Sequence, residues 1–79
     1  MANWVPTSDA QIKMIARGIP GALVDEVLDE GRDAGSGKVP GSQKFDLTLE
    51  DGRIVRVIFF PGDPDVVFSV QWLEHKRSR

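Results

Sequence analysis

Apolar and polar residues repeat with a helical period in the first third of the chain. Residues 8–17 are predicted to form a first helix. Ser8 and Gln11 have the spacing of a capping box, in which the serine side chain accepts from a helical N–H and the glutamine reaches back. Gly18 is expected to end this helix, because glycine adopts a positive φ without steric cost. The apolar side of the predicted helix consists of Ile12, Met14, Ile15 and Ala16.

A second helix is predicted to follow after a very short turn. Pro20 suits its first turn, because the proline ring presets a helical φ, and Gly31 marks its end. Its apolar positions recur at helical spacing: Leu23, Val24, Val27 and Leu28. Its other side carries four carboxylates and no cation: Asp25, Glu26, Asp29 and Glu30.

The second half of the chain alternates apolar and polar residues with a period of two, which is typical of strands. Three strands are expected, over residues 44–49, 53–60 and 66–72. An extended segment at residues 3–5, directly before Pro6, leaves open a short N-terminal edge strand. In the last strand, one face is expected to carry Val66, Phe68, Val70 and Trp72.

The register of the first hairpin follows from its turn. A two-residue Asp-Gly turn would place Leu47 opposite Arg56 and mix the two faces of the sheet. A three-residue turn with Gly52 in the left-handed conformation keeps one face apolar and pairs opposite charges on the other. We therefore predict the second register, with these pairs: Leu47 with Val55, Phe45 with Val57, and Asp46 with Arg56.

Together these elements predict an α+β fold, in which two N-terminal helices pack on a three-stranded antiparallel β-meander. Residues 31–43 hold four of the eight glycines and show no periodicity, so they are predicted to form a flexible loop. The basic tail, residues 74–79, is expected to be solvated. The predicted core consists of Leu23, Val27, Phe45, Leu47, Val55, Val57, Phe68 and Val70.

Composition narrows the class of protein. A chain of 79 residues, 41 % hydrophobic and 28 % charged, is typical of one globular domain. The chain has no cysteine and one histidine, His75, which excludes disulfides and multi-histidine metal sites, so neither a metal nor a cofactor is predicted. No apolar run approaches the roughly 20 residues that span a bilayer. We expect a cytoplasmic protein with no membrane partner.

The distribution of charge bears on the partner. Three of the ten basic residues lie in the tail, and residues 1–73 carry a net charge of −4. Because nucleic-acid binders present clustered lysine and arginine, a direct nucleic-acid partner is disfavoured. The alternatives for the four carboxylates of the second helix are a solvated face and a partner-binding surface for a basic protein or ribonucleoprotein.

Arg53 and Arg56 lie on the second predicted strand, and Arg56 is the candidate for a ligand-binding residue on the sheet. The predicted register places its side chain away from the helices, beside Asp46 and near Ser69 and Gln71. The favoured interpretation of this polar face is a solvated surface with a single cross-strand ion pair. The alternative is a small cleft on the curved sheet.

Three segments of the chain carry a resemblance to a known family: "DAQIKMIARGIPGALVDEVLDEG", "FDLTLEDGRIVRVIF" and "VFSVQW". With them, residues from about Pro6 to Trp72 resemble a small bacterial family of uncharacterised domains related to RelE-like ribonuclease toxins. The resemblance implies the RelE-like fold, with two N-terminal helices on an antiparallel sheet.

The resemblance also implies a degenerate active site. Asp9 stands where the family has a histidine at the start of the first helix, and the basic residue of the central strand corresponds to Arg53 or Arg56. Ser69 matches a threonine of the last strand, and Gln71 stands in place of an aromatic hydroxyl. In an active ribonuclease, the catalytic set of this chain would be Asp9, Arg56 and Ser69.

Two functions from different classes follow from these observations. The favoured one is a non-enzymatic inhibitor from a phage or mobile element, comparable to anti-CRISPR proteins, that blocks a basic nucleic-acid-binding surface. Its partner-binding residues are Asp25, Glu26, Asp29 and Glu30. The alternative is a RelE-like ribonuclease toxin. An antitoxin-like or housekeeping partner is a third possibility, and both a monomer and a homodimer remain open.

Overall fold

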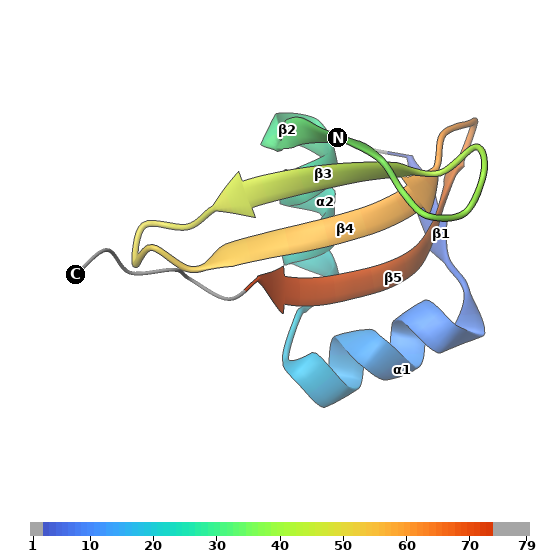
Figure 1. The fold of residues 1–79 in the computed structure, drawn as a ribbon. Coiled ribbons are helices and arrows are strands. Elements are labelled where there is room, and N and C mark those ends of the chain that lie inside the picture. The colour runs from blue at the N-terminus through green and yellow to red at the C-terminus, as the bar shows by residue number, and fades with distance from the viewer. Residues whose placement is uncertain (1–2, 74–79) are drawn as a thin grey trace.

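The computed structural model describes residues 3–73, which form two helices and one five-stranded sheet (Figure 1). The strands lie in the order β1-β5-β4-β3-β2, and every neighbouring pair is antiparallel except β1 and β5. Helix α2 lies behind the sheet in Figure 1, and α1 runs beside β5. In chain order the elements are β1 (Trp4–Pro6), α1 (Ser8–Arg17), α2 (Gly21–Glu30), β2 (Arg32–Ser36), β3 (Gln43–Thr48), β4 (Ile54–Phe60) and β5 (Asp65–Leu73).

The predicted α+β class and the two helices before the main part of the sheet are confirmed. The predicted three-stranded sheet is wrong, because the sheet has five strands. Strands β3, β4 and β5 form the antiparallel meander, and one further strand lies at each edge. The short N-terminal edge strand is present as β1, and it pairs in parallel with β5 so that Val5 lies opposite Val66. The sheet is therefore mixed.

The prediction of a flexible loop over residues 31–43 is wrong for β2 (Arg32–Ser36), which pairs with β3. Its sequence, RDAGS, contains no β-branched or aromatic residue, so no strand pattern indicates it. Pairing with the edge of β3 determines its conformation instead. The Asp33 carboxylate adds two hydrogen bonds, accepting from the Gly35 N–H at 2.8 Å and from the Gln43 side chain at 3.2 Å.

The bounds predicted for the first helix are confirmed, but its cap is one residue earlier. The Thr7 hydroxyl accepts from the Ala10 N–H at 3.1 Å, so the predicted capping box between Ser8 and Gln11 is wrong. Gly18 ends α1 with a φ of 64°, in the left-handed conformation that was expected.

The side of α1 that faces the sheet also differs from the predicted one. Ile12 and Ile15 are 64 % and 84 % exposed. Helix α1 lies beside β5, and the residues that reach the sheet follow the helical spacing Ala10, Lys13, Met14 and Arg17. Long cationic side chains suit this position, because their apolar stems pack while their charged ends form hydrogen bonds.

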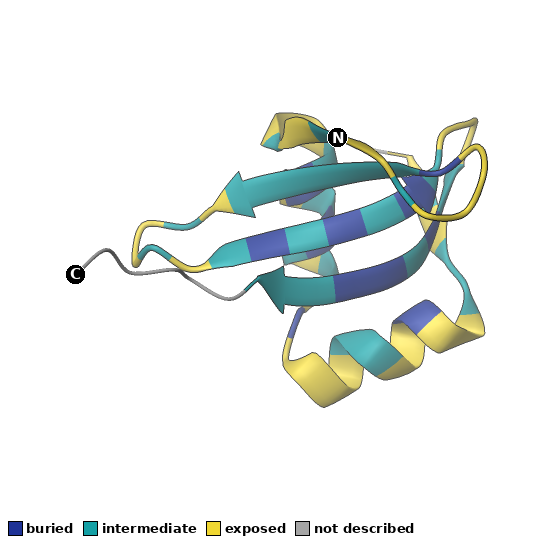
Figure 2. Ribbon diagram, in the orientation of Figure 1, coloured by how far each residue is buried: buried dark blue, intermediate teal, exposed yellow. Residues whose placement is uncertain are grey.

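The predicted hairpin register is confirmed. Asp46 lies opposite Arg56, with Leu47 opposite Val55 and Phe45 opposite Val57. Gly52 has a φ of 91°, which an L side chain rarely adopts. The alternation of buried and half-buried residues along β4 in Figure 2 shows the two faces that this register separates.

The core lies between α2 and the sheet, and it is closed at one side by α1. Of the predicted core residues, Val27, Val55, Val57 and Val70 are buried, whereas Leu23, Phe45 and Leu47 are half-buried and pack against the core. The complete set of buried apolar residues is Ala10, Ile19, Val24, Val27, Val55, Val57, Phe59, Val67 and Val70.

The placement of Phe68 in the core is wrong, because a β-bulge interrupts the pairing of β4 with β5. Ile58 pairs with Ser69, but the next residue, Phe59, pairs with Val67, so Phe68 is the extra residue. The bulge shifts the alternation of β5 by one position. Val67 is buried in the core in place of Phe68, which is half-buried.

Val57→Ala is expected to lower the free energy of unfolding by about 1–3 kcal/mol, because it removes buried apolar surface and leaves a cavity at the centre of β4. Urea denaturation followed by circular dichroism measures this change. The matched control is Ile12→Ala on the exposed side of α1, for which we expect a change within about 0.5 kcal/mol. Equal effects of the two substitutions would contradict the assignment of the core.

In the part of the chain that the structure describes, neither helix has the length and apolar character needed to cross a membrane.

Candidate functional site

The face of the sheet opposite α2, which we call the open face, carries polar and charged side chains from three neighbouring strands. The grouping of these side chains on one face follows from the register of β3, β4 and β5. Lys44 lies opposite Ile58, which lies opposite Ser69 on β5. In the next row, Arg56 lies between Asp46 and Gln71.

A cleft of about 480 Å³ lies on the open face. We call it the basic cleft, because four cationic side chains and no carboxylate line it. Strands β3, β4 and β5 contribute Lys44, Arg56, Ile58, Phe68, Ser69 and Gln71, and the remaining lining residues are Lys13 of α1 and Ser36, Gly37, Lys38 and Val39.

Arg56 is held rigidly by Asp46. Its Nε and Nη2 donate to the two carboxylate oxygens of Asp46 at 2.7 and 2.8 Å, and both side chains are 22 % exposed. The hydrogen bonds that Arg56 donates to Asp46 raise the pKa of Arg56 above its ordinary value, although burial acts in the opposite direction. The guanidinium group therefore stays charged and keeps one orientation at the cleft.

Lys13 reaches the cleft from α1. Its Nζ lies 3.1 Å from a carboxylate oxygen of Asp9, one helical turn earlier, and donates to the Ser69 hydroxyl at 3.4 Å. The Lys13 side chain is 31 % exposed, and that of Asp9 is 69 % exposed. Asp9 thus positions Lys13 beside the buried Ser69, and its own carboxylate is mostly solvated.

Lys38 and Lys44 are the cations of the cleft without a partner. Within residues 3–73, neither forms a hydrogen bond or an ion pair. Lys44 is half-buried on β3, whereas Lys38 is exposed in the segment between β2 and β3. Their charges are therefore available to an anion.

The structure brings together most, but not all, of the residues singled out in the sequence. Arg56, Ser69 and Gln71 line one cleft, as the predicted register implies, and Asp9 contacts it only through Lys13. Arg53 does not belong to the cleft, since its guanidinium lies 4.5 Å from the ring centre of Trp72 and its Nε pairs with Asp51 at 2.8 Å. His75 falls outside the described residues.

Sequence reasoning missed Lys13, Lys38 and Lys44. Lys44 alternates with Phe45, so the predicted strand already placed its side chain on the polar face. The predicted apolar side of the first helix, which includes Ile12 and Ile15, did not point to Lys13 as a residue that faces the sheet. The spacing of Ala10, Lys13 and Arg17 is the signal that identifies the sheet-facing side.

The four carboxylates of α2 do not act as a single surface. Asp25 is half-buried and accepts a hydrogen bond from the Trp4 indole N–H at 3.2 Å, which joins α2 to β1. Glu26, Asp29 and Glu30 are exposed, and we call them the acidic surface of α2. Helix α2 lies behind the sheet in Figure 1. Because the strand residues of the basic cleft belong to the face of the sheet opposite α2, the exposed acidic surface of α2 and the basic cleft lie on different sides of the sheet.

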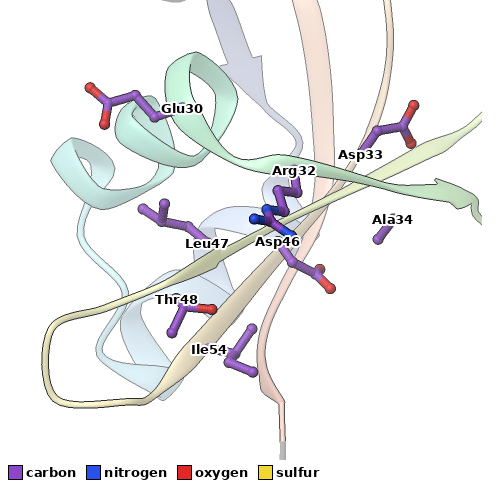
Figure 3. Close-up of a pocket in the computed structure, with 8 residues that line it drawn as sticks. All are labelled: Glu30, Arg32, Asp33, Ala34, Asp46, Leu47, Thr48 and Ile54. Carbon is purple, nitrogen blue, oxygen red and sulfur yellow. The ribbon is translucent and has the colours of Figure 1, made fainter.

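A second, larger cavity of about 590 Å³ lies near β2 (Figure 3). Its lining mixes one cation, Arg32, with the carboxylates of Glu30, Asp33 and Asp46. In Figure 3 these carboxylates point in different directions. In the described part of the chain, no three metal-ligating side chains form a group that could hold an ion. The basic cleft is the stronger candidate, because its charges have one sign.

No protein-family model matches the chain, and no curated protein or solved structure matches it either. The resemblance to RelE-like toxins therefore stays a prediction, and the functional argument depends on the basic cleft.

Proposed function

We propose that the protein is a small, non-enzymatic, cytoplasmic binding module that holds the phosphates of an RNA strand in the basic cleft. The observation that supports this proposal is the convergence of four cations from separate segments of the chain on one cleft. Arginine and lysine are the side chains that bind phosphate oxygens in nucleic-acid complexes, and such contacts supply most of the sequence-independent affinity.

The negative net charge of the chain disfavoured a nucleic-acid partner when the sequence alone was considered. That net charge is a sum over two faces of opposite charge. The acidic surface of α2 lies on one side of the sheet, and the basic cleft lies on the other. At physiological ionic strength, charges are screened beyond about 8 Å. A phosphate group in the cleft therefore responds to the charges nearby rather than to the net charge, and these are four cations and the two carboxylates that pair with Arg56 and Lys13.

Binding without cleavage is proposed because the described lining of the cleft offers no imidazole, phenol or carboxylate as a general base. Cleavage of RNA requires a base for the attacking hydroxyl and an acid for the leaving oxygen. No imidazole or phenol lines the cleft among the described residues, and Asp9 is solvated beside Lys13. The juxtaposition of Arg56 and Ser69 is the one feature that favours the RelE-like ribonuclease.

The direct test of RNA binding is fluorescence anisotropy with a labelled single-stranded RNA at several salt concentrations. For single strands, log Kd is expected to change with log salt by about 0.7 for each phosphate contact. A slope of about 2–3 would correspond to the cations of the cleft, and affinity that does not respond to salt would contradict the proposal.

We expect no specific cleavage when the purified protein is incubated with total RNA or with translating ribosomes. Primer extension detects cleavage sites at nucleotide resolution. The Arg56→Ala variant is the control, because it removes the arginine of the cleft. Cleavage by the wild type that this variant abolishes would support the RelE-like ribonuclease instead.

A second candidate function is the binding of a basic surface on a protein or ribonucleoprotein through the acidic surface of α2, as in an anti-CRISPR-like inhibitor. The observation that favours it concerns Glu26 and Glu30. They are exposed one helical turn apart, and neither forms a hydrogen bond or ion pair in the described part of the chain. Like charges at this spacing repel, and a basic partner would relieve the repulsion.

Glu26→Lys combined with Glu30→Lys tests this second function. We expect slower association with a protein partner recovered from bacterial lysate, and a difference from wild type that shrinks as salt rises. Glu50→Lys, in the exposed turn between β3 and β4, is the control for net charge, and it is compared with the single variant Glu26→Lys, which changes the charge by the same amount. Unchanged association at low salt would show that the acidic surface of α2 is only solvated.

A further inference from the structure

The β-bulge in β5 places an aromatic side chain in the wall of the basic cleft. Val67 is buried in the core, and the next residue, Phe68, is the extra residue of the bulge and lines the cleft instead. Bulges redirect single side chains and are frequent beside functional sites. Phe68 is thus an apolar ring on a face that is otherwise mostly polar.

Phe60 supports the ring of Phe68 from one side. The two ring centres lie 4.8 Å apart with an interplanar angle of 27°, which is a stacked arrangement. Ile58, on the same face of β4, also lines the cleft and extends the apolar floor. A ring that is braced in this way loses little conformational freedom when a flat ligand packs against it.

Cations lie on both sides of this apolar floor. Lys44 is on β3, opposite Ile58, and Lys13 donates to Ser69, the residue that follows Phe68. An aromatic ring between cations suits a ligand that has flat apolar faces along a chain of negative charges. Single-stranded nucleic acid has these features, since its bases stack on aromatic side chains while its phosphates bind lysine and arginine.

We propose that the basic cleft selects single-stranded RNA, with one base stacked on Phe68 and the adjacent phosphates bound by Lys44 and Lys13. This inference rests on the proposed RNA binding and adds the part of the ligand that the ring recognises. In a duplex, the faces of the bases are covered by their neighbours. Phe68 therefore distinguishes a single strand from a duplex that has the same phosphates.

The experiment compares three ligands of about eight nucleotides, within the range of known single-strand sites. They are a uridine oligomer, a ribose-phosphate oligomer of the same length without bases, and a short RNA duplex. By fluorescence anisotropy, we expect wild-type protein to bind the uridine oligomer about five- to a hundredfold more tightly than the other two, which is the range of one base stack.

Two variants separate the ring from the charge. Phe68→Leu is expected to weaken binding of the uridine oligomer about fivefold or more and to leave the oligomer without bases unaffected. Lys44→Ala is expected to weaken binding of both oligomers by the same factor, because it removes a phosphate contact. Phe68→Trp, which keeps an aromatic ring, is expected to preserve the preference for bases. Circular dichroism verifies the fold of each variant.

The outcomes distinguish this inference from the proposed function. Equal binding of both oligomers, with Lys44→Ala effective and Phe68→Leu without effect, would overturn the stacking on Phe68 and leave phosphate binding in place. An equal loss for both oligomers in Phe68→Leu would also overturn it, because the ring would then act only on the shape of the cleft. Absence of binding to every oligomer would overturn the proposed function itself.

Discussion

Lys44→Glu is expected to weaken the binding of single-stranded RNA by about ten- to a hundredfold, equivalent to about 1.4–2.8 kcal/mol. Lys44 is half-buried on β3 and, within residues 3–73, has neither a hydrogen bond nor an ion pair. Reversing its charge replaces an attraction to phosphate with a repulsion at a site that solvent screens only in part. Titration by fluorescence anisotropy at low salt measures the loss.

Arg53→Glu is the matched control for this change in charge. Arg53 lies outside the basic cleft, near the end of the β3–β4 hairpin, where it packs on Trp72. The substitution alters the net charge by the same amount, and we expect less than about a twofold change in affinity, because exposed charges far from the ligand are screened. Equal losses for the two variants would show that RNA responds to net charge and that the cleft is not its site.

The β3–β4 hairpin shows what local sequence determines. The alternation of apolar residues and the position of Gly52 are compatible with only one register that keeps the faces separate. Because that register pairs Asp46 with Arg56, the central ion pair of the open face follows from the sequence. In this hairpin the alternation of apolar residues within each strand and the register between the strands place the same residues on the same face.

Strand β2 and the bulge at Phe68 show what local sequence does not determine. The segment RDAGS has low strand propensity and becomes a strand only because the edge of β3 is there to pair with it. The bulge leaves the composition of β5 unchanged but reverses which face its N-terminal half presents. Since both features depend on the neighbouring strand, the positions of Lys38 and Phe68 around the cleft could not be read from the periodicity.

Asp46→Ala is expected to change stability and RNA affinity in opposite directions. The substitution removes both hydrogen-bond acceptors of Arg56, whose side chain is only 22 % exposed, and leaves its charge without compensation. We expect a loss of about 1–3 kcal/mol in the free energy of unfolding, less than for a fully buried pair, because solvent reaches Arg56 in part. Urea denaturation followed by circular dichroism measures this loss.

The same substitution removes the carboxylate that pairs with Arg56 beside the cleft, so the RNA affinity of the folded protein is expected to rise. Because a destabilised protein loses affinity when it unfolds, an increase cannot result from unfolding. Asp9→Ala is the control for stability: its ion pair with Lys13 spans 3.1 Å, but the Asp9 side chain is 69 % exposed, and we expect a cost within about 1 kcal/mol. A fall in RNA affinity for folded Asp46→Ala would instead show that phosphate binding depends on the orientation that Asp46 gives to Arg56, and that the added positive charge does not compensate for its loss.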